Sequence, residues 1–283
     1  MSKRALTTIV LLFGNYLLIS QDIPGLSYCL LFDSNLEKQA FQKSNNNECD
    51  PLILLLAYDP KIDSAQYISV KNELSGYAVK LQLKRKRFRN ESRFLHYVFY
   101  KVHHEYLKSY KHSETFNGIF NGGSYNCVSG TALYACLLSQ LGYSPKIYET
   151  RYHIFLLVDL KDSSQILFET TDPLAGFVDN KERVSKRIQH YLKDEQETLT
   201  KRLTLSAPFN NHTILEDVSL KEVAGLHYYN LAIDLINKEN YYDAFRALKK
   251  ANILYPESQR IKDFLWFTYL KYESELSTAF VNN

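Results

Sequence analysis

The sequence predicts an α+β protein, in which helices come first, one helix then packs on an antiparallel sheet, and a helical tail follows. Apolar residues recur at helical spacing before residue 110, from 127 to 141 and after 224, whereas residues 145–170 contain β-rich runs separated by turn residues. With 283 residues, 45% of them hydrophobic, the chain has enough apolar side chains for a sizeable core. This composition excludes intrinsic disorder, collagen-like repeats, a disulfide-packed miniature fold and a polytopic membrane protein.

The extreme N-terminus has the pattern of a targeting segment. Lys3 and Arg4 precede an apolar stretch over residues 5–20, which Gly14 and Asn15 interrupt. The stretch is short for a spanning helix, so a signal peptide over residues 1–20 is the favoured interpretation, with an uncleaved membrane anchor as the alternative. The protein is therefore expected to be exported to the periplasm, the cell surface or the medium.

Cysteine spacing leaves one pairing open. Cys29 and Cys49 either form a disulfide in an oxidising compartment or are both free. Cys127 and Cys136 fall on one predicted helix, about 13 Å apart along its axis, so they do not bridge each other. The sequence contains no CxxC pair, so no structural zinc site is predicted.

The first part of the chain is predicted to be helical. Helices are expected over 51–58, 63–83 and 91–110, because apolar residues follow helical spacing and Asp59-Pro60 ends the first. A basic run, Lys84-Arg-Lys-Arg-Phe-Arg89, separates the last two helices. It is either a patch for phosphate or acidic lipid or, as the balanced charge of the rest favours, a solvated helix connection. The net charge of +3 indicates no nucleic-acid partner.

The central segment contains the predicted chemistry. A loop rich in glycine and asparagine, residues 115–125, leads to Cys127 in the first turn of the helix 127–141. The unpaired N–H groups of a helix N-terminus stabilise a thiolate and an oxyanion, so we expect a lowered pKa for this thiol. Strands are expected over 145–150, 152–160 and 165–170.

A histidine and two acids are candidates to complete the site. His153 lies in the apolar run 152–158, where a polar side chain needs a partner. Glu169 and Asp172, at the end of the following strand, are the candidates to bind the second ring nitrogen, and Glu169 is preferred because it lies within the apolar strand. The pair His103-His104 points in two directions on a helix, so no metal site is predicted there.

Over residues 95–175 the chain resembles the transglutaminase-like superfamily, whose papain-like core presents cysteine, histidine and acid in that order. The resemblance implies a helix that begins at the cysteine, a histidine on the next strand and an acid on the strand after. Cys127, His153 and Glu169, or less closely Asp172 followed by Pro173, match these positions. The family's aromatic residue beside the cysteine is absent here, because Asn126 and Val128 occupy those places.

The C-terminal segment is similar to a tetratricopeptide repeat. Small residues at 232, 244 and 251 let two helices approach closely, and Pro256 ends the second. One and a half repeats do not form a free solenoid, so we expect this tail to pack on the core as a buttress, with a peptide-binding groove as the alternative.

These observations predict a signal peptide (1–20), a transglutaminase-like core with N-terminal helices (21–178), a connector (179–223) containing a helix over 181–193, and tetratricopeptide-like helices (224–283). The resemblance implies a cysteine enzyme, a protease, amidase or acyltransferase, that needs no metal or cofactor and acts on a peptide or protein, and the N-terminal pattern predicts that it is exported. The alternative is a catalytically inactive scaffold of the same fold, which binds a protein partner through its helical tail.

Overall fold

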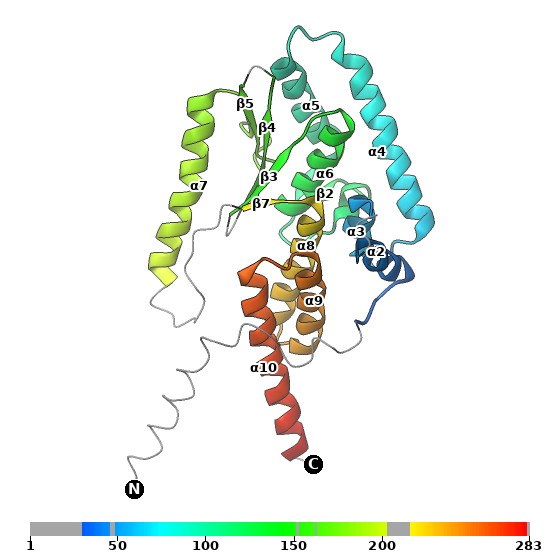
Figure 1. Cartoon of the computed structure of the whole chain (residues 1–283), viewed down its shortest axis with the longest axis vertical. Coiled ribbons are helices and arrows are strands. Elements are labelled where there is room, and N and C mark those ends of the chain that lie inside the picture. The colour runs from blue at the N-terminus through cyan, green and yellow to red at the C-terminus, as the bar shows by residue number, and fades with distance from the viewer. Residues whose placement is uncertain (1–29, 46–48, 151–152, 162, 203–215, 282–283) are drawn as a thin grey trace. The chain divides into compact units, whose positions relative to one another are not determined.

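The computed structural model (Figure 1) describes residues 30–45, 49–150, 153–161, 163–202 and 216–281. Contacts within the chain divide it into two units, Met1–Leu31 and Phe32–Asn283, and every helix and strand named below belongs to the second. The predicted signal peptide and Cys29 lie outside the described residues. Within the described part of the chain, no helix combines the length and apolarity needed to cross a bilayer.

The elements alternate from helical to mixed and back to helical along the chain. The helices are α2 (Asn35–Asn45), α3 (Pro51–Ala57), α4 (Ser64–Arg85), α5 (Glu91–Tyr106), the 3-10 turn η2 (Phe116–Ile119), α6 (Cys127–Gln140), α7 (Lys181–Arg202), α8 (Leu220–Ile236), α9 (Tyr241–Leu254) and α10 (Gln259–Val281). The strands are β1 (Ser109–Tyr110), β2 (Ser124–Tyr125), β3 (Lys146–Glu149), β4 (Ile154–Asp159), β5 (Gln165–Phe168), β6 (Phe177–Val178) and β7 (Glu216–Val218). The protein is therefore α+β.

A five-stranded antiparallel sheet has the order β6-β5-β4-β3-β7, and helices contact both of its faces (Figure 1). Successive side chains of a strand point to opposite faces. On the α7 side, Phe155 of β4 and Leu167 of β5 pack against Val184 of α7. Helix α6 contacts β3 and β4. All but the last residue of β4 are buried, which explains why its sequence is a continuous apolar run rather than an alternating one.

An aromatic cluster joins α5 and α6 to the sheet. The ring of Phe99 on α5 lies 5.6 Å from the ring of Tyr134 on α6 and 5.6 Å from that of Phe168 on β5. All three side chains are fully buried, and the Tyr134 hydroxyl donates to the Phe99 carbonyl at 2.6 Å. This contact satisfies a phenol that would otherwise be buried at a cost.

The predicted helices and strands of residues 51–170 are confirmed with small changes of boundary. The helix predicted over 91–110 ends at Tyr106, and the last two residues form β1, which pairs in parallel with β2. His153 lies one residue before β4 rather than inside it, and Glu169 lies one residue after β5.

The segment 179–223, predicted as a connector, contributes to the sheet layer. Helix α7 extends to Arg202, beyond the predicted end at 193, and contacts β5. β7 adds an edge strand beside β3. α2, β6 and β7 were not predicted.

The tail helices are attached to the rest of this unit by charged contacts as well as by packing. Ala232, Ala244 and Ala251 are fully buried where α8 and α9 pack together. Lys250 of α9 pairs with Glu37 of α2 at 2.7 Å, and both side chains are almost completely buried. The tail therefore packs on the core, as predicted.

Candidate active site

The first candidate residue, Cys127, begins α6. Asn126 caps the helix: its side chain accepts from the Ser129 N–H at 2.8 Å, and the Ser129 hydroxyl accepts from the Asn126 N–H at 2.9 Å. The Asn126 amide also donates to the carbonyls of His112 and Glu114, so the cap is joined to the preceding loop. The cap satisfies the N–H of Ser129 and leaves those of Cys127 and Val128 to approach the thiol.

The second candidate, His153, is held at the end of the β3–β4 hairpin. The Thr150 N–H and hydroxyl donate to the His153 carbonyl at 2.7 and 3.1 Å. Nε2 of its ring contacts Oε2 of Glu169. Nδ1, the other ring nitrogen, makes no hydrogen bond within the described residues.

The third candidate, Glu169, receives several donors. Besides His153, the Thr171 N–H and hydroxyl donate to Oε1 at 3.0 and 2.7 Å, and the Tyr191 hydroxyl donates to Oε2 at 2.9 Å. The side chain is only 2% exposed. Burial alone would raise its pKa, but the hydrogen bonds from His153 and Thr171 outweigh it and lower the pKa below its ordinary value. Glu169 is therefore a buried carboxylate.

Asp172, the alternative acid, has a different partner. Its carboxylate accepts from Arg187 on α7 at 2.6 Å, and its other oxygen caps the turn at Ala175 at 2.9 Å. Burial opposes ionisation, but these contacts lower the pKa of Asp172. Of the two acids suggested by the sequence, Glu169 is the one that contacts His153.

Two residues of α7 join the site without having been predicted. Tyr191 contacts Glu169 through its hydroxyl, and its ring lies 4.6 Å from the His153 ring. Arg187 donates from Nε to the Tyr191 hydroxyl at 2.9 Å while pairing with Asp172. The sequence indicated only that Arg187 and Tyr191 share a face of the helix, because they are four residues apart.

Helix α6 approaches the Glu169 segment closely at Gly130, one turn after Cys127. A Cβ at Gly130 would lie 2.9 Å from Oγ1 of Thr170, which directly follows Glu169. Glycine thus permits this approach. The negative charge of Glu169 consequently acts on the Cys127 thiol.

The pKa of the Cys127 thiol is raised in this geometry, which corrects the expected lowering. Burial raises its pKa to about 11, the charge of Glu169 acts in the same direction, and the backbone N–H groups of Val128 and Cys127 oppose them only in part. Among the described residues, no hydrogen bond joins Cys127 to His153. The helix N-terminus is present as predicted, but desolvation outweighs it.

The adjacent histidines of α5 point in different directions, one into the core and one to the solvent. His103 is buried among the aromatic rings, where burial lowers its pKa to about 4, whereas His104 is exposed. In the described ranges, no three His, Cys, Asp or Glu side chains are placed to hold a metal ion.

Comparisons with known proteins found no matching family model, no matching curated protein and no matching solved structure.

Proposed function

We propose that this chain is a transglutaminase-like cysteine enzyme that hydrolyses a peptide or amide bond, or transfers its acyl group, through a thioester on Cys127. The observation that carries the proposal is the His153–Glu169 pair beside the helix that begins at Cys127. An acid on Nε2 fixes the histidine tautomer and leaves Nδ1 for the thiol proton. A papain-like core with a tetratricopeptide-like tail is part of the same proposal, and so is export.

In the proposed first step, Nδ1 of His153 takes the proton of the Cys127 thiol while Sγ attacks the acyl carbon. The C–S bond forms, and the carbonyl oxygen becomes an oxyanion near the N–H groups of Cys127 and Val128. The C–N bond then breaks, and the amine leaves with the proton from His153. Water, activated by His153, hydrolyses the thioester and restores the thiol. The Glu169 carboxylate stabilises the histidine while it is protonated.

The alternative is a scaffold of the same fold that binds a protein partner and does no chemistry. Two features favour it: the high pKa of the Cys127 thiol, and the missing hydrogen bond between Cys127 and His153 in the described structure. Cys127→Ala separates the two functions, because binding survives this change and turnover does not.

The direct test is the rate at which iodoacetamide alkylates Cys127 as a function of pH, in the wild type and in His153→Ala. Peptide-level mass spectrometry separates this cysteine from Cys49 and Cys136, which are free thiols in this structure and serve as internal controls. Burial raises the pKa of Cys136 to about 12, so it should react very slowly. If the protein is an enzyme, iodoacetamide should alkylate Cys127 at pH values well below the ordinary thiol pKa of about 8.5. The His153→Ala variant should lose this reactivity. A slow profile that His153→Ala leaves unchanged would contradict the proposal.

A further inference from the structure

The corner between α4 and α5 gathers cations from two helices and the turn that connects them. We call this surface the basic corner, and its members are Lys80, Lys84, Lys86, Arg87, Arg89 and Arg93. All six side chains are exposed. The sequence showed only the run 84–89, and the fold adds one cation from each neighbouring helix.

The cations of the basic corner are not neutralised by the protein. Within the described residues, none of the six has a carboxylate partner. Arg85, the second residue of the run, does not belong to the corner. It pairs with Glu91 at 2.6 Å and donates to the Leu141 carbonyl, which the sequence alone did not indicate. The Ser92 hydroxyl donates to the nearby Asp179 carboxylate at 2.6 Å, and the six cations of the corner outnumber this single carboxylate. The corner therefore attracts anions.

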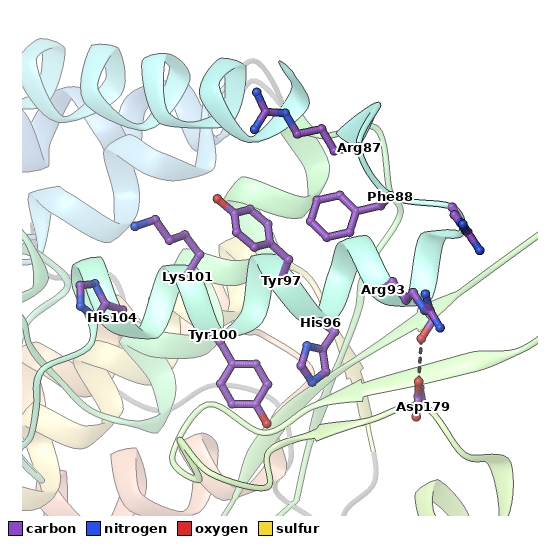
Figure 2. Close-up of a pocket in the computed structure, with 11 residues that line it drawn as sticks. Arg87, Phe88, Arg93, His96, Tyr97, Tyr100, Lys101, His104 and Asp179 are labelled. Atoms are coloured by element: carbon purple, nitrogen blue, oxygen red, sulfur yellow. Dashed lines mark hydrogen bonds between the residues drawn. The ribbon is translucent and has the colours of Figure 1, made fainter. Parts of the chain in front are cut away.

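A hollow of about 1180 Å³ adjoins the basic corner along α5, and Arg87, Arg89 and Arg93 of the corner are among the residues that line it. Figure 2 shows Phe88 beside Tyr97 in this hollow, with Arg87 above them, and the two rings are 5.1 Å apart. Guanidinium groups bind phosphate oxygens through paired N–H donors. The size and lining of the hollow suit a phosphate-bearing headgroup.

Exposed aliphatic side chains lie next to these cations. Val79 and Leu83 on α4 are 59% and 68% exposed, and they share a helix face because they are one turn apart. Lys80 and Lys84 follow each of them directly, on the neighbouring face. Apolar side chains flanked by lysine and arginine characterise helices that lie at a membrane surface.

We propose that the basic corner binds the surface of an anionic membrane. Phosphate groups of lipids would contact the arginines of the hollow, while Val79 and Leu83 enter the headgroup region. A single-stranded nucleic acid would also be attracted by the charge, but it would leave these two aliphatic side chains in water. The inference does not depend on the chemistry at Cys127.

The test is flotation of the full chain with phosphatidylcholine vesicles, with and without phosphatidylglycerol. Any binding through the N-terminal segment is common to all variants. Each cation near an anionic surface contributes about fivefold to affinity, so Arg87→Glu/Arg89→Glu/Arg93→Glu should weaken binding by about 100-fold or more. Raising the salt from about 0.1 M to about 1 M, which shortens the Debye length from about 10 Å to about 3 Å, should release the wild type.

The matched control reverses three exposed cations of α7 in one variant, Lys181→Glu/Arg183→Glu/Lys186→Glu, which changes the net charge equally. This variant should retain most of the binding. Equal losses in both triple variants would overturn the proposal, because they would show a dependence on net charge alone. Binding to neutral vesicles as strong as to anionic ones would overturn it as well.

The aliphatic contribution has its own pair of variants. Val79→Ser/Leu83→Ser should weaken binding by about tenfold, because two apolar side chains no longer enter the interface. The control, Leu270→Ser/Leu276→Ser on α10, removes two leucines that are 46% and 37% exposed, and it should have no effect. If an oligothymidylate binds and the arginine variant loses that binding while vesicle binding is unchanged, the ligand is a nucleic acid and the membrane proposal fails.

Discussion

Tyr191→Phe removes one hydroxyl from the Glu169 carboxylate and leaves the ring in place. In the wild type the hydroxyl donates to Oε2 at 2.9 Å, on the same oxygen that contacts His153. It also accepts from Arg187 at 2.9 Å, so the change breaks two bonds. Since α7 supplies Tyr191 and Arg187, the variant measures how strongly this helix supports the site.

The expected loss follows from the charge of the acceptor. A hydrogen bond to a charged group contributes about 1.5–3 kcal/mol to stability, against about 1 kcal/mol for a neutral pair. Arg187 is partly exposed, so its freed Nε can bond water and adds little. We expect the free energy of unfolding of Tyr191→Phe to fall by about 2 kcal/mol at pH 7.

The loss should depend on pH with a defined sign. The folded-state pKa of Glu169 is lowered, so the stability from its ionised form is complete above the unfolded-state pKa of about 4.3 and disappears as the pH falls through the folded-state value. The difference between the wild type and Tyr191→Phe should therefore shrink when the pH falls below about 4.3. A loss caused by packing alone would not vary with pH.

Urea unfolding at pH 7 and at a series of acidic pH values measures this difference. Tyr148→Phe is the matched control, because Tyr148 packs in the same cluster as Tyr191 and its ring lies 5.8 Å from that of Phe155, while its hydroxyl does not touch Glu169. Equal losses in the free energy of unfolding for the two variants, unchanged by pH, would show that the Tyr191 hydroxyl does not stabilise the Glu169 carboxylate.

Three further variants test other parts of the molecule by urea unfolding. Lys250→Met should destabilise by about 3–5 kcal/mol, because it removes the buried cation that pairs with the buried Glu37 side chain, and Lys250→Met/Glu37→Gln should recover most of the loss; no recovery would mean that charge is not the cause. Burial lowers the pKa of His227 to about 4, so stability should fall as the pH drops from about 6.5 towards 4, by up to about 3 kcal/mol, and His227→Phe should flatten this slope. Gly176→Ala should cost about 2 kcal/mol or more, because its Cβ would clash with the backbone carbonyl oxygen of Glu169, whereas Gly76→Ala, with open space around the Cβ, should be neutral or stabilising.

Periodic apolar patterns predicted most helices and strands, and the exceptions have physical reasons. α2 was missed because its sequence is mostly polar, with few apolar side chains such as Leu36 and Phe41 facing the core. β7 was missed because three residues, Glu-Asp-Val, carry no alternating pattern. Such short edge strands are specified by the partner strand, here β3, rather than by their own residues.

The candidate site was predictable in its residue types but not in its electrostatics. Local sequence placed Cys127 at a helix start and His153 and Glu169 near strand ends. The sequence preferred Glu169 to Asp172 but did not show the partner of Asp172, which is Arg187 on a helix later in the chain. The pKa of the thiol depends on burial by the whole fold, so a helix N-terminus alone gave the wrong direction.

Glu169→Gln distinguishes an enzyme from a scaffold, because it should change the alkylation rate of Cys127 in opposite directions in the two cases. The charge of the carboxylate acts directly on the thiol and raises its pKa, so this direct effect of its removal lowers that pKa. If His153 does not take the thiol proton, alkylation of Cys127 at pH 7 should become faster in Glu169→Gln. If His153 takes the proton, the variant loses the anion that stabilises the protonated ring, and alkylation at and below neutral pH should slow by about tenfold or more. Alkylation of Cys49 in the same sample corrects for reagent activity, and a faster rate at Cys127 would exclude the proposed mechanism.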